Sequence, residues 1–576
     1  MTASTQATFA ATIADELARN QIVDAVVSPG SRSTPLALAL AREPRLRLHV
    51  VLDERSAGFV GLGLALATGR PPVVLTTSGT AAVELHPAVV EAHQAGVPLL
   101  ACTADRPPDL QSVGSPQTIE QAGLYGSATR WAAVLDADAL PAGAWRSMVS
   151  RAVAEAMDGP GGPGPVHLNL PFREPLLGEP GPLPPGRRED LPWHERLQPA
   201  GAPPLETVAA LAEAGSRGVI VAGGSAGSPA AIHRAAGRLG WPVLADPRSG
   251  CRVPEATAVA AADALLRGDE FAAAMAPDVV LRLGDAWASR VLATWLDAQA
   301  DALHVLVDPH GRWIDPGRQA SWVLGCDPTA LCDALAGLPG DAVRAEAGWL
   351  ARWSRAEAVA QAAIDEVLSR HAEPTEPGVA RQLVGQLPDG ATLVVASSMP
   401  VRDVEWYGPP RSRLRVLANR GANGIDGVLS TAVGAALGHG GSQPVIALLG
   451  DLALLHDAGG LLSARWTGAS LTLVVVDNAG GGIFSFLPQA GVLGRPEFER
   501  LFGTPPGIDP VDVLTGYGVR PRVIDRARDL LPGVLDAIGR PGIQAVVVRT
   551  DRGANVAVHD EIHAAVAAAV RGATSR

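Results

Sequence analysis

Two segments in the last third of the chain place oxygen-bearing side chains directly after apolar, β-branched runs. Residues 445–449 form one such run, and Gly450 and Asp451 follow it. Residues 471–476 form another, which leads into Asn478, 27 residues after Asp451. If both runs are parallel strands, their carboxyl ends meet at the edge of the sheet where ligands bind in open α/β domains. The spacing therefore predicts that Asp451 and Asn478 lie close together.

These oxygens suit a hard divalent cation. Asp451 offers a carboxylate oxygen, Asn478 an amide oxygen, and Gly480 a backbone carbonyl oxygen. Mg²⁺ prefers such ligands and completes its octahedron with water and phosphate oxygens, and Mn²⁺ accepts the same set. Gly-Asp at the end of a strand is common by itself, and so is a turn such as the one from Asn478 to Gly480. The two segments together predict a metal–diphosphate site with Asp451, Asn478 and Gly480 as ligands.

The same residues resemble a known motif. Gly450-Asp451-Leu452 with Asp477-Asn478 is similar to the Gly-Asp-Gly and Asn-Asn motif of thiamine-diphosphate enzymes; Leu452 and Asp477 depart from it without removing a ligand. The resemblance implies thiamine diphosphate held through Mg²⁺ (or Mn²⁺). Its implied contacts, besides one catalytic carboxylate, are Ser78, Gly79, Ile425, Gly450, Asp451, Leu452, Asn478, Gly480, Gly481 and Ile483.

Thiamine-diphosphate enzymes also need a carboxylate, on a different domain from the metal, that gives a proton to the ring nitrogen of the aminopyrimidine. The run at residues 47–52 ends in Asp53 and Glu54, and a helical segment follows at residues 56–68. A simpler interpretation is that Glu54 only complements the positive end of that helix, worth ~0.3–1 kcal/mol. With the metal motif present, we favour Glu54 as the catalytic, cofactor-binding carboxylate.

Arginines mark four further loops that follow predicted strands: Arg32, Arg106, Arg402 and Arg420. A guanidinium binds a carboxylate with two parallel hydrogen bonds. Any single arginine more often stays at the surface, but four at strand ends predict a pocket for several carboxylates. The chain also lacks the adjacent histidine pair of many thiamine-diphosphate decarboxylases.

These loops closely resemble the 2-succinyl-5-enolpyruvyl-6-hydroxy-3-cyclohexene-1-carboxylate synthases of menaquinone biosynthesis. The matching segments are Ser-Pro-Gly-Ser-Arg-Ser from Ser28, Thr-Ala-Asp-Arg-Pro-Pro from Thr103, Asn-Arg-Gly-Ala from Asn419 and Ile-Phe-Ser from Ile483. The resemblance implies decarboxylation of 2-oxoglutarate and 1,4-addition of the resulting succinyl-semialdehyde carbanion to isochorismate. The substrate contacts it implies are Ser31, Arg32, Arg106, Gln117, Arg290, Ser398, Arg402, Arg420, Phe484 and Leu487.

Two alternatives remain at this point. Within the same cofactor class, the chain could be an acetohydroxyacid synthase or another 2-oxo acid decarboxylase. In another class, Gly223-Gly224-Ser225 after an apolar run could belong to a nucleotide-dependent oxidoreductase. That segment lacks a full G-x-G-x-x-G and an acidic residue placed for a ribose, so a structural role is favoured.

The elements that must position these residues follow one pattern throughout. Short β-branched runs alternate with Ala- and Leu-rich helical stretches, which is typical of parallel α/β sheets. A Pro- and Gly-rich stretch at residues 177–204 predicts a linker, and a helical stretch at 330–373 a second connection. We therefore predict three doubly wound parallel-sheet domains: residues 1–185 bind the pyrimidine, 186–355 form a central Rossmann-like domain, and 356–576 bind the diphosphate.

Composition narrows the class of protein. The 576 residues are 47% hydrophobic and carry a net charge of −12, which argues against a nucleic-acid partner. The sequence has no long uncharged apolar run, so we predict no membrane insertion. Its N-terminus does not resemble a secretory signal, so we predict no secretion. Four cysteines without paired spacing fit a reducing, cytoplasmic setting. The resemblance further implies a homodimer or dimer of dimers, with active sites shared between subunits.

Overall fold

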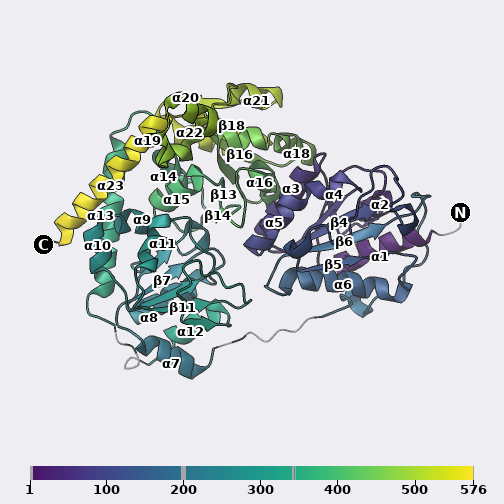
Figure 1. Cartoon of the computed structure of the whole chain (residues 1–576), viewed down its shortest axis with the longest axis horizontal. Coiled ribbons are helices and arrows are strands. Elements are labelled where there is room, and N and C mark those ends of the chain that lie inside the picture. The colour runs from purple at the N-terminus through teal and green to yellow at the C-terminus, as the bar shows by residue number, and fades with distance from the viewer. Residues whose placement is uncertain (1–3, 196–200, 202, 340–342, 344, 575–576) are drawn as a thin grey trace.

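Three parallel sheets form the framework of the protein. The computed structural model describes residues 4–195, 201, 203–339, 343 and 345–574. Each sheet has six strands, and the pairings between neighbouring strands are parallel. In Figure 1 the N-terminal sheet lies at the right, the third sheet at the upper centre and the central sheet at the lower left. The prediction of three doubly wound α/β units is confirmed.

The first sheet has the strand order β2-β1-β3-β4-β6-β5. Helices α1, α2 and α6 pack on one face, and α3 and α5 on the other. The elements are α1 (Thr5–Arg19), β1 (Asp24–Val27), α2 (Thr34–Arg42), β2 (Arg47–Val50), α3 (Glu54–Thr68), β3 (Val73–Thr76), α4 (Thr80–Glu84), α5 (His86–Ala95), β4 (Leu99–Asp105), β5 (Trp131–Val134), α6 (Ala142–Asp158) and β6 (Pro165–Pro171).

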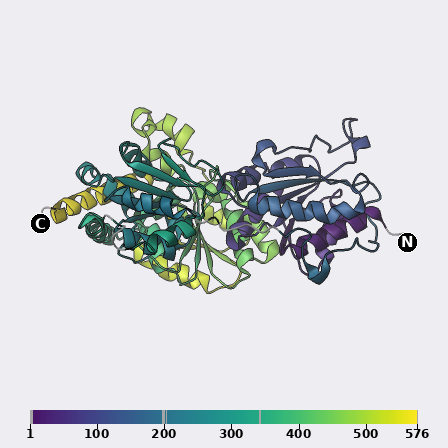
Figure 2. The same cartoon turned by 90° about the horizontal axis from the view of Figure 1, so that it is seen from below.

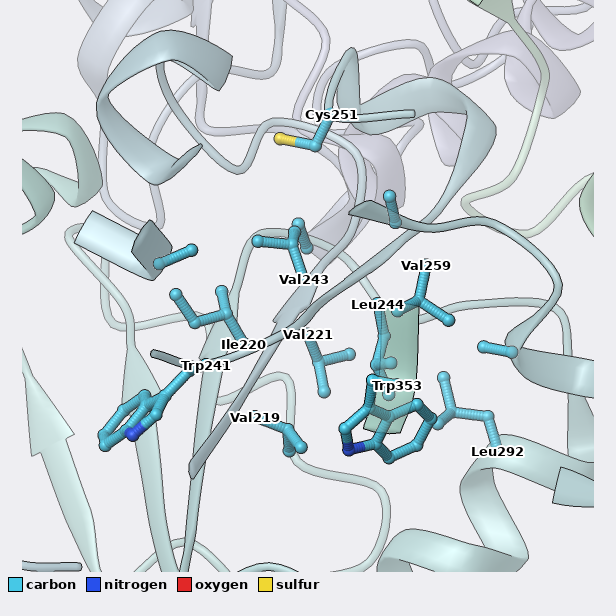
Figure 3. Packing of buried hydrophobic residues seen from close by; sticks show 14 of the residues in the cluster. Val219, Ile220, Val221, Trp241, Val243, Leu244, Cys251, Val259, Leu292 and Trp353 are labelled. Carbon is cyan, nitrogen blue, oxygen red and sulfur yellow. The ribbon is translucent and has the colours of Figure 1, made fainter. Parts of the chain in front are cut away.

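The central sheet has the order β12-β11-β10-β7-β8-β9. Along β7, Ile220 lies on the side of Trp241 and Val221 on the side of Trp353 (Figure 3), as the alternation of a buried strand requires. The elements are α7 (Leu205–Glu213), β7 (Gly218–Ala222), α8 (Pro229–Leu239), β8 (Val243–Ala245), β9 (Ala258–Val259), α9 (Ala262–Leu266), α10 (Asp269–Ala274), β10 (Val279–Leu283), α11 (Arg290–Asp297), β11 (Leu303–Val307), β12 (Trp322–Leu324) and α12 (Pro328–Ala336).

The third sheet has the order β14-β13-β15-β16-β18-β17. Its main elements are α14 (Glu376–Gln386), β13 (Thr392–Val395), α15 (Met399–Tyr407), β14 (Arg415–Leu417), α16 (Val428–His439), β15 (Val445–Gly450), α17 (Asp451–His456), α18 (Gly459–Thr467), β16 (Leu471–Asp477), β17 (Arg522–Ile524), α22 (Ala527–Ile538) and β18 (Ile543–Arg549). Both strands predicted to deliver metal ligands, β15 and β16, are present and adjacent.

Two long helices join the central and third units. The predicted helical stretch at 330–373 contains α12 and α13 (Trp349–Ser369), while its residues 340–342 and 344 lie outside the described residues. Helix α23 (Arg552–Thr574) follows the last strand of the third sheet, yet its Val558, Ile562 and Val566 pack into the central core. Figure 1 shows α23 running beside α13. The predicted domain boundaries remain a prediction.

The predicted linker at residues 177–204 carries one short 3₁₀ turn, Arg188–Asp190, and otherwise no helix or strand before α7 among its described residues. Residues 196–200 and 202 of this stretch lie outside the described residues. In Figure 2 the N-terminal unit lies at one end of the molecule and the C-terminal helix at the other.

Helices α3 and α16 hold the first and third units together through one shared core. A Cβ atom built on Gly63 of α3 would lie 2.0 Å from the carbonyl oxygen of Thr431, and one on Gly434 of α16 would lie 2.0 Å from that of Val60. The helix backbones are therefore in direct contact, which larger residues would prevent.

Within the part of the chain that the structure describes, no helix combines the length and the apolar character needed to cross a membrane. The four cysteines are all buried and unpaired.

Candidate active site

The carboxyl ends of β15 and β16 meet around Asp451. This side chain is buried, and its two oxygens accept hydrogen bonds from Leu452 N and Gly480 N, each at 2.7 Å. Burial raises the pKa of Asp451 to about 6, because the charged form loses hydration. A cation at this carboxylate would offset that loss. The predicted proximity of the two strand ends is confirmed.

Asn478 completes the oxygen set. Its Nδ2 donates to Oε1 of Glu376 at 2.8 Å, while its buried Oδ1 accepts no hydrogen bond from any described residue. Thr550 also donates to the Glu376 oxygen, at 3.2 Å. A buried polar atom without a partner is costly, and a metal ligand is one way to satisfy it. The orphaned amide oxygen next to a buried carboxylate fits a divalent cation.

Gly480 makes the turn between these ligands possible. Its φ of +133° suits only glycine, and a Cβ would lie 2.0 Å from the carbonyl oxygen of Gly503. Its own carbonyl accepts a hydrogen bond from Gly482 N at 2.9 Å, and a second lone pair remains for a metal. Gly481 N donates to Gly503 O at 2.8 Å, so the turn is fixed to its neighbour.

Glu54 is the first residue of α3 and is partly buried. The residue that caps the helix is Asp53, which accepts a hydrogen bond from Ser56 N at 3.1 Å. The helix therefore does not depend on Glu54 for its cap. Burial raises the pKa of Glu54, and the negative charges of Asp53 and Glu84 raise it further. A carboxyl group that holds its proton more tightly is suited to share it with a ring nitrogen.

Polar groups of the first unit gather at the carboxyl ends of β3 and β4. Arg106 donates to Oγ of Ser78 and, at 3.0 Å, to the carbonyl oxygen of Gln117. Gln117 in turn donates to Ser78 O at 3.0 Å. Burial lowers the pKa of Arg106, and the charge of Arg32, in the loop after β1, lowers it further. The structure thus brings together four of the predicted substrate and cofactor residues, with exposed Ser31 beside Arg32.

A buried amide network behind these groups has no counterpart in the sequence-based prediction. Gly79 N donates to Oε1 of Gln121 at 2.8 Å, and Nε2 of Gln121 donates to Asn169 at 2.9 Å. Asn169 donates to Asp105 at 2.8 Å. These residues come from separate segments and share no spacing, so no sequence signal connects them.

Arg402 and Arg420 in the third unit are cations without a carboxylate partner in direct contact. Arg402 donates to the carbonyl oxygen of Ser398 at 2.7 Å, and Arg420 makes no hydrogen bond or ion pair with a described residue. Burial lowers the pKa of both guanidinium groups, and the positive charges of Arg248 and Arg402 lower that of Arg420 further. The negative charge of Glu405 acts on both arginines without direct contact, so each guanidinium keeps donors for a bound carboxylate.

One cavity adjoins Arg420, and a second adjoins Arg290. Arg420 lines a cavity of about 730 Å³ between the three units, together with Arg130, Arg248, Arg312 and Arg415. Arg290, at the start of α11, lines a separate cavity of about 360 Å³ in the central unit. Neither Glu54 nor Asp451 lines the first cavity, so this cavity does not join the two cofactor groups within one chain.

The predicted apolar wall lies on the 3₁₀ turn Gly482–Phe486 and just beyond it. The ring of Phe484 lies 5.5 Å from that of Phe502, Ile483 is partly buried, and Leu487 is 36% exposed. Ile425 packs against the core shared by α3 and α16.

At the topological switch point of the central unit, Gly224 and Asp285 line the cavity of about 730 Å³ that also holds Arg420. In this sheet order, a nucleotide would bind between the loops after β7 and β10. A Cβ on Gly223 would lie 1.7 Å from Asp285 O, and one on Gly284 would lie 2.2 Å from Gly224 O. The two loops therefore touch through their backbones beside this cavity.

Comparisons with protein families agree with this geometry. Residues 7–124 match the thiamine pyrophosphate enzyme N-terminal TPP binding domain, and residues 402–548 match the C-terminal TPP binding domain. Residues 188–395 match the middle domain of thiamine pyrophosphate enzymes. The cofactor of the chain is accordingly thiamine diphosphate, which such enzymes typically bind with a divalent metal.

Curated relatives match almost the whole chain. A 2-succinyl-5-enolpyruvyl-6-hydroxy-3-cyclohexene-1-carboxylate synthase of Thermobifida fusca is 43% identical, over 98% of this chain and 99% of its own length. The synthase of the same name from Chloroflexus aurantiacus is 42% identical over 96% and 95%, and that from Geobacillus kaustophilus 40% over 96% of each. With these identities over nearly its full length, the chain belongs to the 2-succinyl-5-enolpyruvyl-6-hydroxy-3-cyclohexene-1-carboxylate synthase family of thiamine-diphosphate enzymes.

Proposed function

We propose that the chain decarboxylates 2-oxoglutarate and adds the remaining four-carbon unit to isochorismate, giving 2-succinyl-5-enolpyruvyl-6-hydroxy-3-cyclohexene-1-carboxylate and CO₂ in menaquinone biosynthesis. The observation that carries the substrate assignment is the pair of partly buried arginines, Arg402 and Arg420, without carboxylate partners in direct contact. Both substrates carry two carboxylates, which such guanidinium groups bind in pairs of hydrogen bonds.

In this proposal Asp451, Asn478 and the carbonyl oxygen of Gly480 hold Mg²⁺ or Mn²⁺, and the cation holds the diphosphate. When bound, thiamine diphosphate supplies the electron sink that a 2-oxo acid needs to lose CO₂. Glu54 holds the proton at the ring nitrogen of the cofactor. The remaining cofactor contacts are assigned to Ser78, Gly79, Ile425, Gly450, Leu452, Gly481 and Ile483.

The substrate contacts are assigned to residues from all three units. Ser31, Arg32, Arg106 and Gln117 belong to the first unit, and Ser398, Arg402, Arg420, Phe484 and Leu487 to the third; Arg290 is the contact from the central unit. An acetohydroxyacid synthase would act on pyruvate, whose single carboxylate leaves most of these arginines without a partner. The density of positive charge therefore favours the dicarboxylate substrates.

We also propose a homodimer or dimer of dimers. Leu48, Val50 and Leu52, on β2 and directly after it, are exposed beside Glu54, and so are Val83 of α4 and Trp466 of α18. Helix α18 packs beside β2, so these apolar side chains come from neighbouring elements. Exposed apolar groups gathered in this way are typical of an interface. A second copy would bury them and bring its metal site to Glu54.

The shared site is tested by mixing inactive variants. Glu54→Gln and Asp451→Ala chains are refolded together, so that about half of the dimers are mixed by random pairing. In a mixed dimer one site collects both defects and the other none, so roughly a quarter of the wild-type activity returns. If well-folded mixed dimers stay inactive, each site lies within one chain.

The reaction is tested by mixing the protein with isochorismate, 2-oxoglutarate, thiamine diphosphate and Mg²⁺. Loss of isochorismate and release of CO₂ are expected to depend on all four components. Pyruvate replaces 2-oxoglutarate in the control. Efficient formation of acetolactate from pyruvate would instead support the acetohydroxyacid synthase. We expect this chemistry in the cytoplasm, in keeping with four cysteines that are all unpaired.

A further inference from the structure

A glutamate of the first unit holds the loop that carries Arg420. Glu91 lies on α5 and is 1% exposed. Its Oε1 accepts a hydrogen bond from Gly421 N at 2.8 Å, and its Oε2 accepts from Ala422 N at 2.6 Å and from Asn423 N at 2.8 Å. The three amides follow Arg420 directly in sequence. A buried carboxylate thus binds three successive backbone N–H groups, an arrangement known from anion-binding loops.

The close approach at Gly421 is a second, independent sign of this contact. A Cβ on Gly421 would lie 2.7 Å from Ala95 N and 2.8 Å from Glu91 O. The loop backbone therefore rests directly on the last turns of α5, and a side chain at residue 421 would push it away. Both the hydrogen bonds and the shape of the loop depend on α5.

The rest of the loop is fixed within the third unit. At its start, Asn419 donates to Oγ1 of Thr431 at 3.0 Å. Beyond the amides, Nδ2 of Asn423 donates to Asp426 O at 2.7 Å. The stretch between these two anchors carries Arg420 and Ile425, which the proposed function assigns to substrate and cofactor. Among the described residues, Glu91 supplies the only side-chain acceptors for the amides of residues 421–423.

We propose that Glu91 is a positioning residue for the Arg420 loop, and that each first unit thereby serves two active sites. Its Glu54 edge contributes to one cofactor site, while its α5 shapes the substrate loop of the other. This inference rests on the proposed function, because it requires a site shared between two chains. Glu91 then belongs functionally with the third unit of its own chain, although it lies on the same sheet unit as Glu54.

Single variants test the positioning role. Glu91→Ala leaves three buried amides unpaired and lets the loop move, so kcat/KM is expected to fall roughly 10²-fold, as for a reacting group displaced by about 1 Å. Most of the loss is expected as a higher KM for the substrates. Calorimetric binding of thiamine diphosphate with Mg²⁺ is expected to persist, because Asp451 and Asn478 are untouched and Ile425 also packs against the core shared by α3 and α16. Glu91→Gln keeps one acceptor oxygen, so its kcat/KM is expected to lie between those of Glu91→Ala and the wild type.

The control is Glu213→Gln, an exposed carboxylate on α7 that is expected to change none of these values. Thermal unfolding of each variant distinguishes a misplaced loop from a loss of the fold. If Glu91→Ala does not fold, Glu91→Gln is assayed in its place. Wild-type KM values in folded Glu91→Ala would overturn the positioning role.

Mixed dimers test the second part of the inference. Glu91→Ala in one chain and Glu54→Gln in the other place both defects in the same site, so the other site stays intact and activity returns toward a quarter of wild type. Glu91→Ala with Asp451→Ala places one defect in each site, and no recovery is expected.

The pair Glu54→Gln with Asp451→Ala separates the two possible failures. If this pair does not recover, the shared site of the proposed function is wrong. If this pair recovers activity, the shared site stands. The inference about Glu91 is then wrong if Glu91→Ala chains regain activity with Asp451→Ala chains and not with Glu54→Gln chains.

Discussion

At the scale of single residues, burial raises the pKa of carboxyl groups on both sides of the proposed site. Glu54 has negatively charged neighbours, Asp53 and Glu84, and forms no ion pair with a described residue. Asp451 is held by two backbone amides and adjoins the orphaned oxygen of Asn478. The first environment favours a carboxyl group that keeps a proton, whereas the second favours a carboxylate that binds a metal.

Glu54→Gln is expected to lower turnover by roughly 10²–10⁴, the usual size of a lost acid–base group. Glutamine keeps the size of the side chain but has no acidic proton to share with the ring nitrogen. Steady-state rates measure the loss, and calorimetry is expected to show that thiamine diphosphate still binds. Near-normal turnover in this variant would remove Glu54 from the catalytic role.

Asp451→Ala is expected to weaken the binding of Mg²⁺ and thiamine diphosphate steeply, because it removes the carboxylate of the metal site. Titration calorimetry measures this directly. Asp477→Asn is the matched control, since it restores the asparagine of the family motif next to Asn478 and leaves both side-chain ligands in place. Equal affinities in wild type and Asp451→Ala would contradict the metal assignment.

Sequence reasoning identified Asp451 and Asn478 because both follow β-branched runs, whose parallel pairing brings their ends together. It missed Glu376 and Glu91, which orient the site from a distance. Glu376 contacts Asn478 across 102 residues, and Glu91 contacts Gly421 across 330 residues. No local pattern distinguishes these glutamates from others on helix surfaces, so only the folded chain reveals them.

At the scale of elements, the contact of α3 with α16 depends on two glycines. Gly63→Ala would place a methyl group 2.0 Å from Thr431 O, so the helices must separate. We expect a loss of ~1–3 kcal/mol or more in the free energy of unfolding, as for other overpacked cores. Urea or thermal unfolding provides the measurement.

Gly237→Ala is the control for this prediction. Gly237 lies inside α8, and a Cβ there would have no heavy atom within 4 Å. Alanine is expected to stabilise the protein at this position by roughly 0.5–1 kcal/mol, through its higher helix propensity. If both alanine variants behave alike, close packing between α3 and α16 is not what Gly63 provides.

Helix α23 carries a partly buried histidine, His563, that is expected to limit stability in acid. Tyr407 Oη lies 3.0 Å from Nε2 of His563, and burial, with the charges of Arg267 and His559, lowers the pKa of His563 to about 3. The unfolded chain takes up a proton near pH 6.5 and the folded chain only near pH 3. Stability is therefore lost as the pH falls below 6.5, by ~2 kcal/mol at pH 5 from this group.

His563→Gln keeps an acceptor for Tyr407 but cannot take up a proton. Thermal unfolding at pH 7 and pH 5 is expected to show a smaller difference in Tm for this variant than for the wild type. An unchanged difference would mean that His563 is not the group responsible.

The element-level prediction succeeded where strands are long and buried. The runs at residues 445–449 and 471–476 match β15 and β16 to within one residue. Short edge strands such as β9, with two residues, and β14 and β17, with three each, were missed. Too few residues alternate there to give a periodic signal. The packing of α23 on the central core was also missed, because it depends on a long-range contact.

At the scale of the whole molecule, each unit is tied to another by elements that leave their own sheet. Helix α23 places Val558 and Ile562 in the central core after the third sheet is complete. Helix α5 places Glu91 against the loop after β14. The arrangement of the three units is therefore fixed by specific side chains as well as by the connecting segments, and it determines which residues can meet in one chain.

In the proposed shared site, binding of the cofactor and formation of the dimer strengthen each other. If thiamine diphosphate and its metal contact Asp451 of one chain and Glu54 of another, they bind the dimer more tightly than the separated chains. By mass action the cofactor must then strengthen the dimer, with the effect growing as RT ln(1 + [L]/Kd) for each site. Sedimentation velocity across a dilution series is expected to show dissociation at higher protein concentration when EDTA has removed the metal. Addition of Mg²⁺ and thiamine diphosphate is expected to restore the dimer in the wild type and not in Asp451→Ala. A dimer whose dissociation ignores the cofactor would place both contacts within one chain.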